Sequence, residues 1–530
     1  MVMSCRSPRY TIFAERLVQS LQHGFRSPLV LVIVLANSGF FSFCYSQTAG
    51  VSASSQHWVG TWSTAPQLVE PGNMPPSPGL TNNSLRQVVR VSIGGDTLRV
   101  RFSNEFSTSA VTMKSVHIAA STGGNTINVS TNTELKFTGN AEITMNAGAT
   151  VTSDPIGFAL TPRMDLAITI YYGQTSTSVT GHPGSRTTSY IIAGNTTTTT
   201  DFTGAVTTDH WYNINAIDVL APSTAACVAI LGNSITDGRG STTNMQNRWP
   251  DVFSESLLQD SSTQQVGVLN LGIGGNCVLS GGLGPTGVSR YDRDILNQSA
   301  VHWAIVFEGV NDIGGVNSSA AATTTANNLI AAYRQMIVKA HTNNIRIYGA
   351  TILPFNGNGY YNQYSESCRK TVNLWIRTTG NFDGCIDFDK TMRNPLDTTR
   401  LVSTYQNDGL HPDAAGYKKM GESIDLNLFT VSTTLGVNSI DPVNGYALGQ
   451  NYPNPFNPST ELPFSLPIRS FVSIIVFDTI GRKVATIVSE ELPAGSYTRQ
   501  WNAAKMSSGI YYCRMQASSF VETKKLLLLR

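Results

Sequence analysis

Charged residues are scarce in this chain of 530 residues. They account for 13% of it, and 36 Lys and Arg against 34 Asp and Glu leave a net charge of +2. A nucleic-acid-binding protein needs a concentrated basic surface, which so few and so balanced charges do not provide. We therefore expect no nucleic-acid partner. The hydrophobic share of 41% indicates globular structure, and the length indicates more than one domain.

Cysteine is also uncommon. The chain has seven cysteines, and no Cys/His spacing resembles a metal site, so we expect no metal. Cys368 and Cys385 stand at either end of a predicted helix-to-strand connection. In an oxidising export compartment these two are candidates for a disulfide.

The chain lacks an apolar run long enough for a comfortable membrane span. Its most apolar run, residues 29–43, follows four arginines and precedes small residues that suit a signal peptidase. This pattern predicts a signal peptide over residues 1–46, with cleavage after Ser46. Bulky Phe43 disfavours a lipoprotein anchor at Cys44. We expect export and no stable membrane span.

Residues 57–220 are rich in Thr, Ser, Val and Gly and contain segments that alternate apolar with polar residues. Period-two segments separated by turns predict a β-sandwich, which we expect to be jelly-roll-like. A hairpin is predicted with its turn at residues 94–96, so that residues 89–93 face residues 98–102.

Residues 224–430 alternate short apolar runs with amphipathic helical patterns. The strand-like runs are 227–231, 266–271, 302–309, 345–354 and 385–389. This alternation predicts an α/β domain of three layers, with a parallel sheet between helices on both faces. In such sheets the chemistry is placed at the carboxyl ends of the strands.

Those strand ends hold a set of residues that suits acyl transfer. The reaction needs a hydroxyl nucleophile, a base, a carboxylate to orient the base, and donors for the oxyanion. We predict the catalytic residues to be Ser234, Asp408 and His411. We predict the oxyanion hole to form from Ser234, Gly275 and Asn311.

Each of these residues has a structural alternative. A serine before a helix is a common N-cap, and the G-x-S-x-G elbow of the α/β-hydrolases is absent here. Asn311 alone would serve a turn, and Gly275 alone a left-handed backbone. Because the whole set falls at the strand ends in complementary roles, catalysis is the favoured interpretation.

Four motifs, "GNSITDG", "GIGGN", "GVND" and "DGLHP", closely resemble the sequence blocks of the GDSL or SGNH hydrolases. The resemblance covers residues 224–430 and implies a flavodoxin-like domain. It implies Ser234 as nucleophile and oxyanion donor, Gly275 and Asn311 as further donors, His411 as base and Asp408 as its partner. "WVGTWSTAPQ" and "HPGSRTTSY" resemble the amino-terminal sandwich of a secreted, two-domain branch of that family.

One position departs from the family pattern. The family motif has aspartate before the serine, whereas this chain has Asn233. Asparagine is nearly isosteric with aspartate and keeps an accepting carbonyl, but it carries no charge. Ser234 therefore remains the predicted nucleophile, and the effect of Asn233 on activity is left open.

The last 80 residues are predicted to form short strands after a segment rich in proline and asparagine. One interpretation is a small β module that binds carbohydrate. The other follows from a resemblance: residues 449–530 closely resemble the carboxy-terminal sorting domain of the type IX secretion system. That resemblance implies the secretion machinery as partner, a secreted or cell-surface location, and removal of the tail. Residues 431–448 are the predicted linker.

The sequence thus predicts a secreted serine-dependent carboxylic-ester hydrolase. We expect it to remove short acyl groups, acetyl above all, from carbohydrate or other polar alcohols, without a cofactor. The alternatives are a lipase or arylesterase for longer acyl esters and a non-catalytic surface protein that binds carbohydrate. His182 and Arg186 in "GHPGSR" are expected in a solvated loop, with an interdomain cleft as the alternative.

Overall fold

The computed structural model describes residues 56–430 and 446–529, apart from residues 452, 494 and 519. The predicted signal peptide and most of the predicted linker lie outside the described residues. Within the described part, none of the helices is long and apolar enough to cross a membrane.

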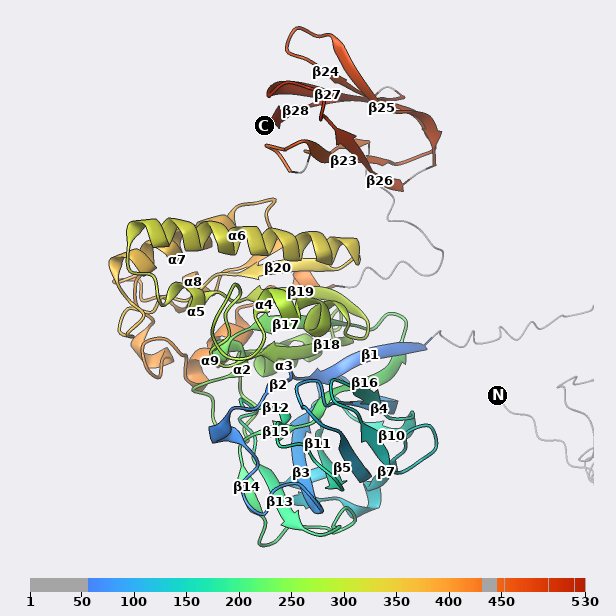
Figure 1. Cartoon of the computed structure of the whole chain (residues 1–530), viewed down its shortest axis with the longest axis vertical. Helices are drawn as coiled ribbons and strands as arrows, with labels where there is room; N and C mark the ends of the chain where they lie inside the picture. Colours follow the sequence, from blue (N-terminus) through green and yellow to red (C-terminus); the bar gives the residue numbers. More distant parts are fainter. Residues whose placement is uncertain (1–55, 431–445, 452, 494, 519, 530) are drawn as a thin grey trace, which may run out of the picture. The chain divides into compact units, whose positions relative to one another are not determined.

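Residues 56–222, here called the N-terminal β region, form antiparallel sheets (Figure 1). One sheet has the order β1 (Gln56–Ser63), β16 (Ile214–Pro222), β4 (Gly95–Ser103) and β10 (Ile156–Leu160), with β9 (Thr150–Thr152) beside β4. A second has the order β14 (Val206–Thr208), β13 (Ser189–Ala193), β3 (Asn83–Arg90), β11 (Asp165–Tyr172), β5 (Val111–Gly123) and β6 (Thr126–Ile127), with β7 (Thr133–Leu135) and β8 (Ile143–Met145) beside β5. A small third sheet has the order β15 (Trp211–Tyr212), β12 (Thr180–His182) and β2 (Gln67–Leu68). Short helices η1 (Pro71–Asn73) and η2 (Val129–Thr131) lie in the connections.

The predicted hairpin at residues 94–96 is wrong. β3 pairs with β11 and β13, whereas β4 pairs with β16, β10 and β9, so the chain passes from one sheet to the other at this point. Apolar side chains of both strands, such as Val89 and Val100, are fully buried in the same core. Period-two alternation thus identified the buried faces, but it carries no information on which strand is the hydrogen-bonding partner.

The central domain contains the parallel sheet that the sequence predicts. Its order is β18 (Val266–Gly272), β17 (Ala226–Gly232), β19 (Val301–Phe307), β20 (Arg346–Ala350) and β21 (Gly384–Ile386), and all four pairings are parallel. The order reverses beside β17, the first strand. In open α/β sheets, ligands bind at the carboxyl edge where the order reverses.

Helices cover both faces of this sheet. The longer ones are α3 (Trp249–Gln259), α6 (Ser319–Thr342), α7 (Gln363–Arg377) and α9 (Ala414–Glu422); the shorter ones are α2 (Ser234–Asp237), α4 (Gly287–Tyr291), η3 (Asp292–Leu296), α5 (Val310–Ile313), α8 (Phe388–Met392), η4 (Ser403–Tyr405) and η5 (Leu426–Phe429). Tyr348 of β20 packs on Phe429, which packs on Phe253 of α3. The next residue, Gly349, lies against Phe382. The Phe382 ring packs against Tyr333 of α6 and Trp375 of α7. Because successive strand residues point to opposite faces, α3 and the α6–α7 pair lie on opposite sides.

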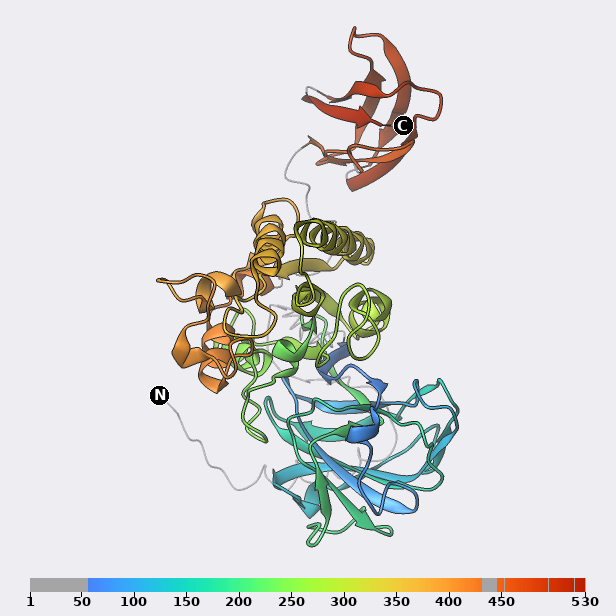
Figure 2. The same cartoon turned by 60° about the vertical axis from the view of Figure 1, so that its left-hand side comes forward.

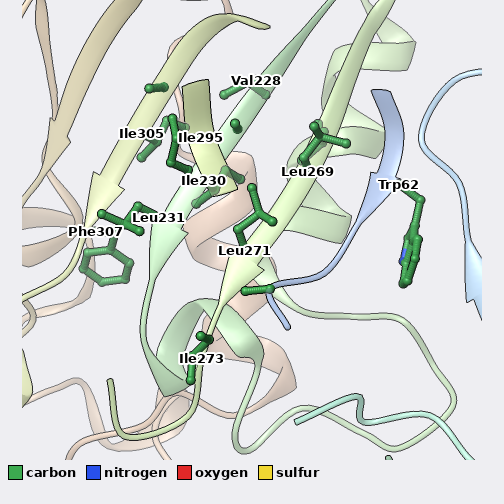
Figure 3. Close-up of a cluster of buried hydrophobic side chains, with 14 of the residues drawn as sticks. Trp62, Val228, Ile230, Leu231, Leu269, Leu271, Ile273, Ile295, Ile305 and Phe307 are labelled. Carbon is green, nitrogen blue, oxygen red and sulfur yellow. The ribbon is translucent and has the colours of Figure 1, made fainter. Parts of the chain in front are cut away.

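The sheet and the N-terminal β region share one hydrophobic core. Figure 3 shows strand side chains such as Ile230, Leu269 and Ile305 within it, with Trp62 of β1 nearby. The amide of Gly60 in β1 donates to the carbonyl of Ser299, and a side chain at this glycine would meet Leu269. β1 therefore packs directly against the parallel sheet.

The C-terminal strands have a hydrophobic core of their own. These strands are drawn in orange to red in Figure 2. One sheet has the order β22 (Ala447–Leu448), β23 (Ser459–Leu466) and β26 (Gly495–Asn502); the other has β25 (Lys483–Leu492), β24 (Ser470–Phe477), β27 (Gly509–Ala517) and β28 (Phe520–Leu528). β22 occupies the end of the predicted linker and already pairs with β23. This part of the chain is accordingly a separately packed β unit.

The expected disulfide between Cys368 and Cys385 is wrong, since both are free thiols. Cys368 lies on the buried side of α7, against the backbone of Ala326 in α6. Cys385 lies on the edge strand β21, paired with Gly349. Proximity in sequence suggested the pair, but the two side chains contact different neighbours.

Candidate active site

Ser234 begins the short helix α2, directly after β17 ends at Gly232. The helix is capped by the preceding residue, because the Asn233 side chain accepts a hydrogen bond from the amide of Ile235 at 3.0 Å. The Ser234 hydroxyl is therefore not consumed as an N-cap. The structural alternative considered for this serine is wrong.

Ser234, His411 and Asp408 form a continuous hydrogen-bonded chain. Ser234 Oγ lies 2.8 Å from His411 Nε2, and His411 Nδ1 lies 2.8 Å from Asp408 Oδ2. Because a carboxylate only accepts, Nδ1 carries the proton donated to Asp408, and Nε2 is free to accept from the serine. The loop before α9 holds this geometry, since Asp408 Oδ1 also accepts from the amides of Leu410 and His411.

The local environment favours a neutral histidine beside an ionised aspartate. Burial lowers the pKa of His411 below its ordinary value; the charges of Arg239 and Arg186 act in the same direction, and Asp408 opposes them. For Asp408, burial acts to raise the pKa, but the hydrogen bonds from His411 and Leu410 outweigh it, so the pKa is lowered. At neutral pH the histidine can therefore accept a proton.

Gly275 and Asn311 lie in the same pocket as Ser234 and His411. Gly275 has φ +70°, a conformation that suits glycine. Asn311 Nδ2 donates to the carbonyl of Asn276 at 2.7 Å, which fixes the orientation of the amide because a carbonyl only accepts. The Tyr360 hydroxyl donates to Asn311 Oδ1. One hydrogen of the amide nitrogen remains to bind a ligand oxygen.

Asn233 contacts a buried acid that the sequence interpretation overlooked. Its Nδ2 donates to Glu308 Oε1 at 3.1 Å, and the amide of Gly309 donates to the same oxygen. Burial raises the pKa of Glu308 to about 8. The guanidinium of Arg290, 4.0 Å from Glu308 Oε2, also binds the carbonyl of Gly232 at the end of β17. An asparagine here supplies a donor that an aspartate would lack.

The N-terminal β region contributes directly to the pocket. The pocket has a volume of about 440 Å³ and is lined by Gln67, Glu70, Asn73, Pro183, Gly184, Arg186 and His210 from that region, and by Ser234, Asp237, Arg239, Gly274, Gly275, Leu283, Asn311, Tyr360, Leu410 and His411 from the central domain. It thus lies where the two parts of the chain meet, at the carboxyl edge of the parallel sheet.

His182 is buried rather than solvated, so that the solvated-loop expectation is wrong for this residue. Its Nε2 lies 2.8 Å from Asp237 Oδ1, and its Nδ1 lies 2.9 Å from the carbonyl of Ala65. Asp237 belongs to α2, the helix that carries Ser234. The backbone of Gly184 approaches Asp237 so closely that a Cβ there would overlap its carboxylate. The "HPGSR" segment therefore packs onto the serine-bearing helix.

A further residue that was not predicted from the sequence stabilises the loop after β18, which contains Gly275. Asp312, the last residue of "GVND", accepts hydrogen bonds from the amides of Val278 and Leu279. It thereby ties the segment after β18 to the segment after β19. Its place inside a motif was a signal in the sequence, but the partners of a carboxylate cannot be read from a motif. In the described part of the chain, no cluster of three or more His, Cys, Asp or Glu could hold a metal ion.

A parallel sheet with a hydrogen-bonded serine, histidine and aspartate at its carboxyl edge is an arrangement found in serine-dependent acyl hydrolases. Residues 230–419 match the model of the GDSL-like lipase/acylhydrolase family, and residues 450–529 match that of the secretion system C-terminal sorting domain. The protein is accordingly a carboxylic-ester hydrolase with a GDSL-type domain and a sorting domain. Both predicted resemblances are confirmed.

Several solved structures are similar to part of the chain. A GDSL-like lipase from Bacteroides thetaiotaomicron is 19% identical over 37% of this chain and 84% of its own, with a TM-score of 0.27. A catalytic mutant of an acetylxylan esterase from Geobacillus stearothermophilus is 16% identical over 38% of this chain and 92% of its own, with a TM-score of 0.29. Such values carry no argument about the substrate. No curated protein matches the chain.

Proposed function

We propose that Ser234 is the nucleophile of a secreted esterase that removes short acyl groups from polar alcohols. In this reaction Ser234 Oγ attacks the ester carbonyl carbon, and its proton moves to His411 Nε2. The observation that carries the proposal is the 2.8 Å contact between these atoms, continued by the 2.8 Å contact to Asp408. Asp408 orients the imidazole and stabilises its charged form.

The negative charge of the tetrahedral intermediate requires donors. The proposed donors are the backbone amides of Ser234 and Gly275 and the remaining hydrogen on Asn311 Nδ2. When the intermediate collapses, His411 gives its proton to the departing alcohol. Water then attacks the acyl-enzyme with His411 again as base, which releases the carboxylic acid and restores Ser234. Apart from water, the side chains of Ser234, His411, Asp408 and Asn311 and two backbone amides supply every group in this cycle.

The pocket lining supports a short acyl group and a polar alcohol. Leu283 and Leu410 are its only aliphatic lining side chains within the described residues, apart from a proline, and Tyr360 adds one ring. Each methylene of an acyl chain is worth about 0.8 kcal/mol when buried, and these side chains can cover few of them. Amide, carboxylate, imidazole and guanidinium groups form much of the remaining wall and suit hydroxyl groups. This supports acetylated carbohydrate as the substrate.

The two alternatives differ from this proposal in measurable ways. A lipase or arylesterase would gain catalytic efficiency as the acyl chain lengthens or as the alcohol becomes aromatic. A carbohydrate-binding protein without activity would have no use for a hydrogen-bonded triad in its pocket, and the family match speaks against it.

Ser234→Ala should abolish hydrolysis of acetyl esters while the protein stays folded, since Ala fits wherever Ser fits. The matched control is Ser367→Ala on the exposed side of α7, which should hydrolyse as the parent does. Activity of Ser234→Ala within tenfold of the parent would mean a loss of no more than about 1.4 kcal/mol and would overturn the assignment. A kcat/KM that rises steadily from acetyl to long-chain esters of one alcohol would replace the proposal by the lipase alternative.

The sorting domain indicates export. We further propose that the mature protein begins near Gln47 and ends before the sorting domain, because the proposed catalytic residues all lie between residues 234 and 411. Intact-mass measurement of the exported protein tests this, and a mass that includes residues 449–530 would contradict removal of the tail.

A further inference from the structure

We propose that the alcohol part of the substrate carries a carboxylate, as in a sugar acid, and that Arg186 and Arg239 bind it. This inference rests on the proposed function and narrows its substrate. Arg186 comes from the N-terminal β region and Arg239 from the segment after α2, and both line the pocket that holds Ser234 and His411.

The two guanidinium groups lack hydrogen-bonded side-chain partners within the described part of the chain. Of the acids nearest to them, Asp408 binds His411, and Asp237 binds His182 through Oδ1 while its Oδ2 has no described hydrogen-bond partner. The distance from Arg186 to Asp237 is 3.8 Å and that from Arg239 to Asp408 is 3.9 Å, both too long for hydrogen bonds. The terminal nitrogens of both arginines thus make no hydrogen bond to any described side chain and can donate to a ligand.

Arg186 shows two further features of a binding residue. Its Nε is buried and has no hydrogen-bond partner among the described residues, so the two terminal nitrogens are the donors that a ligand can contact. Its backbone has φ +52°, a left-handed conformation that costs a non-glycine residue about 1 kcal/mol or more. The amide of Asn244 holds this conformation by donating to the Arg186 carbonyl. The fold maintains a strained arginine at the wall of the pocket.

Two acids, Glu70 and Asp237, also line the pocket. Glu70 accepts from Gln67 Nε2 at 2.5 Å and from Asn73 Nδ2 at 3.0 Å. These neutral amides donate one hydrogen bond to each Glu70 oxygen, and they orient the carboxylate without removing its charge. Planar guanidinium groups match the geometry of a carboxylate and bind it through charge-assisted hydrogen bonds.

The position of the arginines assigns the charge to the alcohol side of the ester. Arg186 and Arg239 both act electrostatically on His411. His411 is the group that returns a proton to the departing alcohol, so the alcohol leaves past this histidine. A carboxylate on the alcohol therefore meets the arginines, while the ester oxygen that becomes the oxyanion lies toward the proposed donors Gly275 and Asn311.

The test compares an acetylated glucuronoside with the acetylated glucoside of the same linkage, since the two differ only in a carboxylate. We expect the parent enzyme to prefer the charged substrate by kcat/KM by about tenfold or more, and added salt to reduce the preference. Arg186→Gln and Arg239→Gln should each lower this ratio by about tenfold, which equals about 1.4 kcal/mol for one charge-assisted contact. Arg334→Gln on the exposed face of α6 is the matched control and should keep the ratio.

The outcomes separate this inference from the proposed function. If the parent hydrolyses both substrates with equal efficiency and Ser234→Ala hydrolyses neither, the carboxylate site is overturned and the proposed function stands. Failure to hydrolyse either acetyl ester would overturn the proposed function. Arg239 is 59% exposed, so Arg239→Gln should fold even where Arg186→Gln does not, and an unchanged ratio in Arg239→Gln would contradict its role.

Discussion

Replacing Asn233 by aspartate would restore the family residue and, from the structure, should make stability fall at high pH. Asn233 Nδ2 donates to Glu308 Oε1 across 3.1 Å, and both side chains are buried. With aspartate at position 233, a carboxylate oxygen would take the place of the Nδ2 donor and would face Glu308 Oε1 at about the same distance. If both acids were ionised, their repulsion would be about 5 kcal/mol at an effective dielectric constant near 20. The pair would therefore retain one proton, with Glu308 donating to Asn233→Asp.

The direction in which stability changes with pH follows from the number of protons bound by the folded and the unfolded state. In the parent, the folded pKa of Glu308 is raised to about 8 against 4.5 for an ordinary glutamate. Its folded state therefore keeps a proton that the unfolded chain has released, and stability falls as pH rises from about 4.5 to about 8 and then levels off. In Asn233→Asp the proton is held well above pH 8. The fall should continue there at about 1.4 kcal/mol per pH unit.

The assay is thermal unfolding of parent and variant between about pH 6 and about pH 9.5. A domain of this size loses roughly 2–4 °C in Tm per kcal/mol, so the Tm gap should widen above pH 8 by about 3–6 °C per pH unit. The double variant Asn233→Asp with Glu308→Gln replaces the acid by an amide donor, and above about pH 8, where the stability of the parent has levelled off, its Tm gap to the parent should stay constant. A gap in the single variant that does not change with pH would refute the shared proton.

Three further predictions concern other parts of the site and fold. Because burial and the charges of Arg186 and Arg239 lower the pKa of His411, kcat/KM should fall on acidification with a midpoint below 6.5; a profile flat to about pH 4 would exclude this histidine as base. His182→Ala leaves Asp237 buried without its partner and should lower the free energy of unfolding by about 3–5 kcal/mol in chemical denaturation, unlike an exposed substitution. Alkylation of the denatured, unreduced protein should modify all of the cysteines with described positions, and a mass that indicates a missing pair of thiols would contradict the free Cys368 and Cys385.

The family and the parallel sheet could be predicted from the sequence because both depend on short-range patterns. Each strand of the sheet is a compact apolar run, and such runs are buried wherever they occur. Ser234, Gly275 and Asn311 follow three of these strands closely in the sequence. The sequence alone therefore placed them at one edge of the sheet. The sorting domain was recognisable for a similar reason, since its motifs are contiguous.

The tertiary structure alone decided the contacts between distant segments. β3 and β4 look like a hairpin in sequence, but they belong to different sheets, because burial patterns do not encode strand partners. Cys368 and Cys385 are close in sequence, yet helix packing directs them to different neighbours.

The site shows the same division between local and distant information. The sequence by itself determined which chemical groups stand at the carboxyl ends of the strands. It did not determine that His182 binds the helix of Ser234, that Glu308 receives the Asn233 amide, or that Arg186 enters the pocket. The two hydrogen bonds join residues 55 and 75 positions apart, and every one of these contacts depends on how separately patterned segments pack against one another. Periodicity and motifs describe a segment, whereas the energy of a buried polar pair depends on both partners being present in space.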